Sequence, residues 1–507
     1  MHGGFGALDW TVFFGYFLIL GVSSWLFSRI RVDNARDYFV GGNSVPMLAA
    51  AVSVLATSQS AATFLGGPEF SYRKDLTFLG FYLSGFLAVV FVAKVLVPRF
   101  YAVGAVTVYE LLEKRYGAKA KREAGAMFLV GRLFASGARL FIGALAVAMI
   151  LYGDIAASHV AVAIAVLTAG ALAYAYFGGV KSVIYSDAIQ AFTYVGAGVA
   201  VLVYLYGALD TDLSTMVRIL SDEGKLKLLD TTGNFGIGSL LGGWLLLNIA
   251  AYGLDQDMAQ RILSCRDRKE AERSLYVSIL LTIPVAVLFL AIGLLLYLFY
   301  RHPELSGFSG NVSETFDGEK IKIFMTFILH EMPEGLRGLV TVGAIAAALS
   351  STNSVLSAMA SVAVEDLYRP WALKRGRRDE AHFLKAGRAA VLLFAAALSM
   401  MAMLSYWWQR SSDLPLLSFA LGVMAFAYAG LLGVYASALF TRGGSGALVP
   451  WALAGGFLTV LFFQPYVSGN LIGMKLSLAW QLAAGTAVAF AVMQLPVGSG
   501  KEKHERT

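Results

Sequence analysis

Charged residues are scarce in this chain, and cysteine is almost absent. Only 14% of the 507 residues are Asp, Glu, Lys or Arg, whereas a soluble protein carries about a quarter. The single cysteine, Cys265, excludes a disulfide within the chain and a metal site built from several thiolates. The six histidines lack ligand spacing, and no pattern indicates a nucleophile with its base or a phosphate-binding loop. These gaps argue against a soluble protein and against an enzyme.

Apolar runs take the place of charge along the whole sequence. Hydrophobic residues make up 58% of the chain, and the mean hydropathy is +0.67. A helical run of about 20 apolar residues crosses a bilayer core of about 30 Å. The pattern predicts an all-α polytopic membrane protein with about thirteen transmembrane helices. Their approximate cores are 9–28, 44–68, 77–98, 124–151, 157–177, 183–206, 235–256, 275–299, 338–364, 389–406, 415–440, 446–465 and 471–494.

The positions of the basic residues predict the orientation. Lys and Arg gather after the first, third, seventh and ninth spans, in segments 29–36, 99–122, 261–273 and 369–388. These odd-numbered connections share one side, which the positive-inside rule makes cytoplasmic. The N-terminus is then outside and the tail 501–507 inside. No basic stretch precedes the first apolar run, so we expect a retained helix there and not a cleaved signal peptide. Because the basic residues fall in alternate loops, the net charge of +7 does not indicate nucleic-acid binding.

The ninth span has an unusual polar face. No charged residue interrupts 338–364, yet Ser350, Ser354, Ser357 and Ser361 follow the spacing i, i+4, i+7 and i+11, so they line one side of a helix. Such hydroxyls can bond to neighbouring helices or back to their own backbone. They can also supply neutral oxygens to a cation at membrane depth. Both interpretations stand at this point.

Two other spans look interrupted. The second carries Ser, Thr and Gln residues between 53 and 63 and is expected to end at 66–68 (Gly-Gly-Pro), where a break would free backbone carbonyls. The seventh has a matching irregularity from Asn248 to Asp257. Unwound backbone at membrane depth survives where it lines a cavity or an ion site. Interruptions five spans apart suggest two five-helix repeats, spans two to six and seven to eleven.

Six short motifs occur in order along the chain. They are Asp37–Gly42 (DYFVGG), Ala56–Phe64 (ATSQSAATF), Tyr109–Arg115 (YELLEKR), Phe177–Asp187 (FGGVKSVIYSD), Gln260–Arg261 and Ala346–Ser351 (AAALSS). Together they resemble the sodium:solute symporter family, which includes bacterial proline, sugar, pantothenate and sialic-acid carriers. The resemblance runs from about residue 37 to about residue 440.

The resemblance implies a fold and a mode of action. The fold is a five-plus-five inverted-repeat core of leucine-transporter type, with segments 1–43 as an extra N-terminal helix and cytoplasmic loop, 44–440 as the transport core and 441–507 as C-terminal helices and a short cytoplasmic tail. Such proteins couple inward sodium flow to solute uptake by alternating access. The implied partners are a small-molecule solute, sodium as the coupling ion and the lipid bilayer, with no other cofactor.

The resemblance also implies sodium ligands. The main site draws on the carbonyls of Ala56, Gln59 and Ala347 and the hydroxyls of Ser350 and Ser351, in agreement with the Ser-rich face. Gln59 stands where an apolar residue is common, which need not matter if its backbone binds. A possible second sodium site uses Asp187, Asn353 and Ser354. Asp187 is expected to be charged and near water on the cytoplasmic side; the alternative is an interfacial acid at a helix start.

The implied solute site lies where the two interrupted helices meet. The positions that match solute-facing residues of the family are Ser58, Ser60, Thr63, Phe78, Tyr82, Arg132, Arg139 and Asp255. Arg132 and Arg139 are seven residues apart, so they share a helix face. Arg132 matches an arginine that sialic-acid carriers use on a carboxylate, or it snorkels to the cytoplasmic surface. Arg139 is too deep to snorkel, so it must be paired or face water.

The sequence therefore predicts a sodium-driven symporter of a bacterial-type inner membrane, not an enzyme. Ala-rich segments with a few polar groups at mid-depth suit a small polar solute, and an organic acid or amino acid fits better than a sugar. The alternatives are a proton-coupled carrier that uses Asp187 or Asp255, a transporter-like sensor, and a channel. The solute, the sodium stoichiometry and the oligomeric state stay open.

Overall fold

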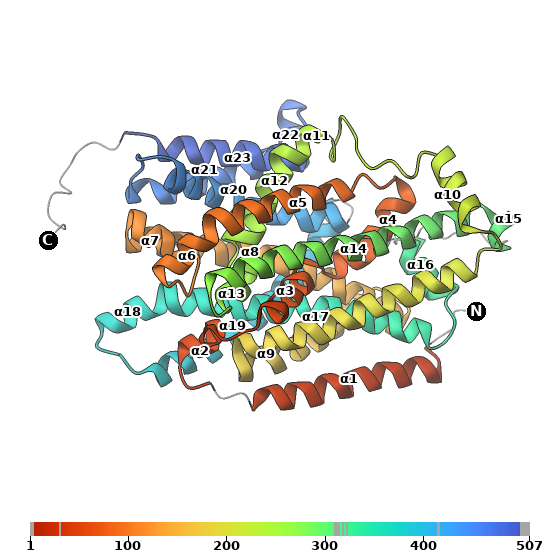
Figure 1. Cartoon of the computed structure of the whole chain (residues 1–507), viewed down its shortest axis with the longest axis horizontal. Helices are drawn as coiled ribbons and strands as arrows, with labels where there is room; N and C mark the ends of the chain where they lie inside the picture. Colours follow the sequence, from red (N-terminus) through yellow and green to blue (C-terminus); the bar gives the residue numbers. More distant parts are fainter. Residues whose placement is uncertain are drawn as a thin grey trace.

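The computed structural model describes residues 5–29, 32–308, 315–316, 319–320, 323–412 and 416–496, and these form a helical bundle. Most helices run along the long axis of the molecule (Figure 1). Arg31, in the first basic loop, and the predicted cytoplasmic tail 501–507 lie outside the described residues.

The first half of the chain contributes α1 (Ala7–Ser28), α2 (Ala35–Val40), η1 (Gly41–Asn43), α3 (Met47–Ser58), α4 (Ala61–Arg73), α5 (Leu79–Phe91), η2 (Val92–Leu96), α6 (Val97–Val103), α7 (Glu110–Tyr116), α8 (Ala118–Tyr152), α9 (Ala157–Gly207), α10 (Leu213–Asp222), α11 (Ile237–Ser239), η3 (Leu240–Trp244), α12 (Leu245–Ile249), η4 (Ala250–Leu254) and α13 (Gln256–Leu263). The second half contributes α14 (Arg268–Arg301), α15 (Pro303–Ser306), the antiparallel strands β1 (Thr315–Phe316) and β2 (Glu319–Lys320), α16 (Ile323–His330), α17 (Leu336–Val362), η5 (Ala363–Tyr368), α18 (Arg369–Lys374), α19 (Glu380–Ser412), α20 (Leu416–Phe440), η6 (Gly446–Leu448), α21 (Val449–Phe462), α22 (Pro465–Ile472) and α23 (Leu478–Met493).

Helix lengths confirm a polytopic membrane protein. Within the described ranges, eight helices are long and apolar enough to cross a membrane, or nine if the bent pair α3 and α4 counts as one span. Three shorter apolar helices lie at 424–440, 446–462 and 478–493. The 51 residues of α9 cover the predicted spans 157–177 and 183–206, and the helical backbone is interrupted at Gly179 (φ 59°, ψ −152°). The total of thirteen spans, the side that each terminus faces and the division at residues 43 and 440 stay predictions.

The helix α17 is the centre of the bundle. It contains the Ser-rich span, and every residue from Val340 to Val362 is buried. Small residues allow this, because a Cβ at Gly343 would come within 2.7 Å of Ala197 on α9, and one at Gly143 on α8 within 2.7 Å of Ala348. The serine hydroxyls therefore face other helices and not lipid.

An acid from α1 fixes the start of α17. The buried carboxylate of Asp9 accepts the backbone N–H groups of Gly335 at 2.8 Å and Gly338 at 2.6 Å. The first N–H groups of a helix have no partner within it, and a negative charge there also suits the helix dipole. The extra N-terminal helix thus anchors the central helix of the core.

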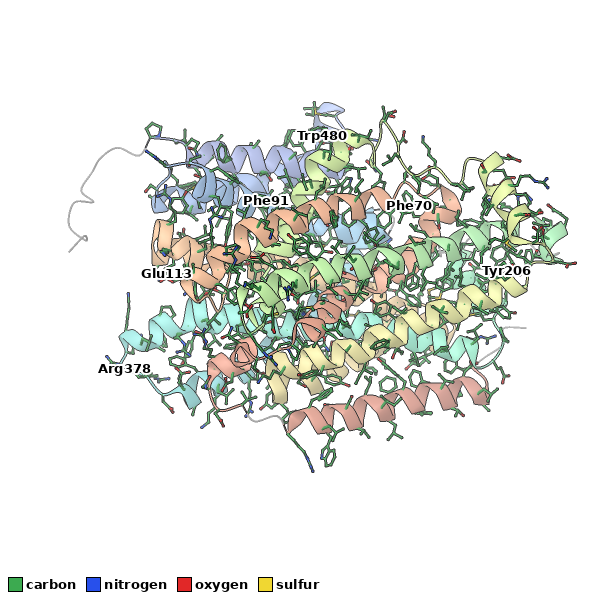
Figure 2. All side chains as sticks on the ribbon, viewed as in Figure 1. Phe70, Phe91, Glu113, Tyr206, Arg378 and Trp480 are labelled. Carbon is green, nitrogen blue, oxygen red and sulfur yellow. The ribbon has the colours of Figure 1, made fainter. Side chains whose placement is uncertain are left out.

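The basic connections gather at one end of the molecule. Figure 1 places α2, α6, α7 and α18 at one end and α10 and α15 at the other. Figure 2 shows Glu113 of α7 and Arg378, just after α18, at the first end, and Tyr206 of α9 near the second. The prediction that these basic segments share one side agrees with this arrangement.

Candidate functional site

The first helix break lies between α3 and α4. Gln59 (φ −91°, ψ 143°) and Ser60 (φ −143°, ψ 173°) are extended. The Ser60 N–H donates to Thr63 Oγ1 at 2.7 Å, so it does not bond to the carbonyl four residues earlier, on Ala56. In the part of the chain that the structure describes, the Ala56 carbonyl is therefore left without its helical donor.

The predicted break at 66–68 is wrong, because α4 continues through Pro68 to Arg73. The cap formed by Ser60 and Thr63 starts a new helix before the proline is reached. Beyond Pro68 the helix is bonded to α14, where Ser71 donates to the Leu290 carbonyl at 2.8 Å. A cap and a neighbouring helix outweigh the hydrogen bond that the proline removes.

Opposite the first break, α17 presents Ser351. Its Oγ lies 3.3 Å from the Gln59 carbonyl oxygen and 3.2 Å from that of Ala347. Three of the five predicted sodium ligands thus meet, and the free carbonyl of Ala56 lies one turn before the break. Ser350 points elsewhere, because it donates to Asp187 Oδ1 at 2.9 Å.

The expectation that Asp187 lies near water is wrong, because its side chain is fully buried. It accepts from Ser53 Oγ at 2.5 Å and lies 3.3 Å from Arg261 Nη2. It is not a helix-start acid either, because it sits eight residues past the interruption at Gly179. Carboxylates far from water need such partners, since an isolated buried charge is costly.

The other two residues of the predicted second sodium site have partners of their own. Ser354 Oγ accepts from Arg261 Nη2, and Asn353 donates its amide to Ser186 Oγ at 3.1 Å. The structure brings Asp187 and Ser354 together around a guanidinium, with Asn353 turned toward α9.

The second break lies at Asp255, between η4 and α13. Its backbone is extended (φ −88°, ψ 117°), and its carboxylate caps α13 by accepting the Asp257 N–H at 3.0 Å. Arg132 of α8 donates Nε to Asp255 Oδ1 at 3.0 Å, and its Nη2 lies 3.3 Å from Asp257 Oδ2. The Tyr428 hydroxyl donates to the other Asp255 oxygen. The irregularity predicted in the seventh span is confirmed, and Arg132 is a buried ion-pair partner that does not snorkel.

Arg139 differs from Arg132 although both are on α8. Its Nη2 lies 2.7 Å from the Met424 sulfur, and within the described ranges it makes no ion pair. A thioether is a weak acceptor, whereas a guanidinium has five donors. One turn further along α8, Gly143 lies against Ala61 at the first break and Ala348 of α17. Arg139 thus makes no ion pair within the described ranges. It lies one turn along α8 from the residue that faces the first break, and within electrostatic range of Asp255 and Asp257 at the second.

The remaining predicted solute residues fall into two groups. Ser58, Ser60 and Thr63 are at the first break, where Ser58 donates to the Leu55 carbonyl at 2.7 Å and Thr63 to the Ser60 carbonyl at 2.8 Å. Phe78 and Tyr82 pack edge to face with ring centroids 5.6 Å apart in an aromatic cluster with Phe235. The structure groups the first three with the predicted sodium ligands and the two rings with each other. Tyr82 also interacts with the Gln59 side chain at the first break.

Sequence reasoning assigned no binding role to Arg261, Asp257 or Tyr428. It counted Arg261 among the basic residues of the loop after the seventh span, which is wrong, because Arg261 lies buried in α13. Arg261 is fully buried and contacts both Asp187 and Asp257. The spacing of Asp257 and Arg261, four residues apart on one helix face, was a usable signal. Nothing in the local sequence of α20 marks Tyr428, because its partner comes from a distant segment.

Comparison with known proteins identifies the family of this chain. The model of the sodium:solute symporter family matches residues 38–451. The chain is 29% identical to the sodium/sialic acid symporter SiaT of Proteus mirabilis over 382 residues, 72% of each chain. It is 27% identical to human sodium-coupled monocarboxylate transporter 1 over 466 residues, which is 90% of this chain and 72% of that one.

Solved structures confirm the predicted leucine-transporter-type fold. A Na+-coupled sialic acid symporter in a substrate-bound, outward-open state matches with a TM-score of 0.80 and 24% identity, over 96% of this chain and 97% of that chain. A nucleobase–cation symport family transporter matches with a TM-score of 0.53 and 14% identity, over 92% and 94%. The relatives named here are transporters and not enzymes. With the family model covering most of its length, this chain belongs to the sodium:solute symporter family.

Proposed function

We propose that this protein is a sodium-driven symporter that imports a small organic acid or amino acid by alternating access across a bacterial inner membrane. The observation that carries the solute class is Arg139, a cation on α8 without a carboxylate partner among the described residues. An arginine at membrane depth needs a counter-charge or water. A solute carboxylate supplies both the charge and two oxygens in the geometry of a guanidinium.

The sodium ion is proposed to bind at the first break. The ligands are the carbonyls of Ala56, Gln59 and Ala347 and the hydroxyl of Ser351, with Ser350 as a fifth ligand if it turns from Asp187. Neutral oxygens from an unwound helix suit a monovalent cation, because they replace its water without holding it too strongly. The contacts of Ser351 with Gln59 and Ala347 support this set.

The charges at the second break support Arg139 over Arg132 as the solute contact. Arg132 already has Asp255 and Asp257 as partners, so a solute carboxylate would have to displace them. Two of the named relatives carry acids, sialic acid and monocarboxylates. A sugar is the second candidate solute, because the chain is also 27% identical to the sodium/glucose cotransporter of Vibrio parahaemolyticus.

Proton coupling through Asp187 or Asp255 has less support. Each carboxylate is buried in an ion pair with an arginine, Arg261 or Arg132. A proton taken up there would break that pair and weaken the counter-charge of a buried guanidinium. A proton carrier must change its charge in each cycle. Sodium coupling needs no such change at these acids.

The test is uptake into proteoliposomes with an inward sodium gradient, with choline as the control cation. The probes are radiolabelled lactate, pyruvate, sialic acid, proline and glucose. We expect sodium-dependent uptake of at least one carboxylate, competition by other carboxylates and no competition by their amides. Uptake of glucose alone, or uptake equal in choline, would contradict the proposal.

Variants of the two arginines then test the solute contact. Arg139→Gln should abolish carboxylate uptake while the protein still folds and binds sodium, and Arg139→Lys should weaken it sharply, because lysine cannot make the two parallel bonds. Arg132→Lys is the matched control on the same helix face, and we expect it to lower thermal stability first. If Arg139→Gln takes up the carboxylate as well as the wild type does, Arg139 is structural.

A further inference from the structure

The connection between α18 and α19 carries a dense cluster of exposed positive charge. Four of its five residues from 374 to 378 are cations, and we call this segment the basic tip: Lys374, Arg375, Arg377 and Arg378. All four are exposed, and Figure 2 shows Arg378 at one end of the molecule. Within the described ranges the ion pairs of this connection are those of Arg369, and the four cations make none. A surface with so much unbalanced charge suits an anionic partner.

The two helices that carry the basic tip are joined at its base. Arg369 of α18 donates Nη1 and Nη2 to the two carboxylate oxygens of Glu380, the first residue of α19, at 2.7 and 2.9 Å. The Tyr368 hydroxyl lies 2.7 Å from His382 Nε2. Between these contacts the backbone turns at Gly376 with a φ of 78°, which glycine adopts without strain. The basic tip is therefore held on a short closed loop.

Exposed apolar side chains lie directly beside these cations. Trp371 and Leu373 of α18 are both 44% exposed, and the Arg375 guanidinium lies 4.0 Å from the centre of the Trp371 ring. An aromatic ring next to arginines and lysines is typical of the membrane interface, where the ring meets the acyl boundary and the cations meet phosphates. A soluble anion would use the cations alone and leave both apolar side chains in water.

The position along the helix agrees with the level of the lipid head groups. The uncharged stretch 338–364 is the predicted membrane core, and α17, η5 and α18 continue as one helical segment, Leu336–Lys374. Its part α18 begins five residues beyond 364, about 8 Å along the axis at 1.5 Å per residue. The head-group layer is roughly 5–8 Å thick on each side of the hydrocarbon core. Trp371 and the basic tip thus lie at or just beyond this layer.

The basic segment between α13 and α14 is different, although it is also predicted to be cytoplasmic. Between 266 and 273 its four cations alternate with the acids Asp267, Glu270 and Glu272. Arg266 lies 4.0 Å from Glu270, and Arg268 lies 2.6 Å from Glu272. Acids within the segment balance most of its positive charge. The lack of such balance distinguishes the basic tip from this other positive connection.

We propose that the basic tip, together with Trp371 and Leu373, is a binding site for the head groups of anionic phospholipids. The lipid holds the end of the helical segment that also carries Ser351. This inference goes beyond the proposed function, and it depends on neither sodium nor solute. Each Lys or Arg beside an anionic lipid surface changes the affinity about fivefold, so the four cations together make a strong preference over neutral lipid.

The test is a lipid titration of the purified full-length protein in a neutral detergent, with the melting temperature as the readout. A ligand that binds the folded state raises that temperature. We expect phosphatidylglycerol to do so at lower concentration than phosphatidylcholine, and added salt to reduce the difference. The variant Lys374→Gln/Arg375→Gln/Arg378→Gln should need at least about tenfold more phosphatidylglycerol for the same effect. It leaves Arg377 in place, whose Nη1 donates to the Tyr368 hydroxyl at 3.4 Å.

The matched control is Arg266→Gln/Lys269→Gln/Arg273→Gln, which removes three exposed cations from the segment between α13 and α14. It should titrate like the wild type. If the first triple variant does not fold, Arg378→Gln alone should shift the titration about fivefold. Equal titration by the wild type and the tip variants, or an equal loss in the control, would overturn the inference.

Inorganic phosphate and polyglutamate distinguish lipid from soluble anions. We expect neither to raise the melting temperature at the concentrations at which phosphatidylglycerol does. If either one stabilises the wild type as well as the lipid does, the basic tip binds soluble anions and the inference is wrong. None of these measurements involves sodium or solute, so their failure leaves the proposed symport intact.

Discussion

The two helix breaks of this carrier are built from different chemistry. At the first, between α3 and α4, the groups are neutral: backbone carbonyls and the hydroxyls of Ser60, Thr63 and Ser351. At the second, before α13, the groups are charged: Asp255 and Asp257 with Arg132. At both breaks the helix is interrupted by one or two residues in extended conformation, so the backbone alone does not distinguish the two breaks.

This difference indicates which of the two breaks can bind a cation. A buried charge must be paired, so the second break satisfies itself and becomes part of the scaffold. Neutral carbonyls tolerate weaker partners, and within the described residues the Gln59 carbonyl accepts one hydrogen bond, from Ser351 at 3.3 Å. A site that must bind and release a cation in every cycle needs groups like those of the first break, which are neutral and loosely satisfied.

The largest effect expected is on stability, at the second break. Asp255→Ala removes the partner of Arg132, the acceptor of Tyr428 and the cap of α13. Breaking a buried ion pair costs about 3–5 kcal/mol when the remaining charge is uncompensated. Because Asp257 still lies 3.3 Å from Arg132, we expect the lower end of this range. The measurement is thermal unfolding of the purified protein in detergent, with and without sodium.

The double variant Asp255→Leu/Arg132→Met is the control for this first prediction. Removing both charges should recover part of the lost stability, since a hydrophobic pair of similar volume often replaces an ion pair well. If the Asp255→Ala protein keeps its melting temperature but loses sodium binding, the second break is a sodium site and not part of the scaffold, which contradicts this prediction.

The next effect is on sodium affinity, at the first break. Ser350→Ala/Ser351→Ala removes two hydroxyls, and losing a good cation ligand costs about 1–3 kcal/mol, roughly five- to hundred-fold in apparent affinity. The half-saturating sodium concentration for uptake in proteoliposomes measures it. Because Ser350 bonds to Asp187, Ser351→Ala alone should account for most of the change. If the half-saturating sodium concentration is unchanged in the double variant, sodium does not bind at this break.

A smaller effect is expected from the cap that creates the first break. Thr63→Val removes the acceptor of the Ser60 N–H without much change in volume. Loss of a helix cap costs about 1 kcal/mol. We expect a modest drop in melting temperature together with weaker sodium binding, because the freed N–H can return to the Ala56 carbonyl. Thr352→Val on α17 is the control, since its hydroxyl bonds only to the Ala348 carbonyl of its own helix at 2.8 Å.

The smallest expected effect tests whether Gln59 binds sodium through its backbone carbonyl and not through its side chain. Gln59→Leu keeps the carbonyl that faces Ser351 and changes only the side chain. The sodium half-saturation should shift less than about twofold, roughly 0.4 kcal/mol. A larger shift would mean that the side-chain amide, and not the carbonyl, takes part in binding.

Much of the fold could be predicted from short-range patterns. Apolar runs of helical length indicated the polytopic bundle, and the Ser face of 350–361 indicated a helix whose hydroxyls meet neighbouring helices or a cation. The irregularity at 248–257 marked the second break, because a cluster of Asn, Gly and Asp is unusual inside a span. The first break was misplaced, since proline is a strong local signal and a Ser–Thr cap is a weak one.

What the sequence by itself determined is the membrane architecture, the family and the identity of the polar residues at membrane depth. These follow from local composition and spacing, which act over one or two helical turns. Which charge meets which was decided only by tertiary structure. Asp187 and Arg261 are 74 residues apart, and Arg132 and Asp255 are 123 apart. Helix packing alone brings such residues together, and it leaves Arg139 unpaired within the described bundle while Arg132, on the same face of α8, has two acids.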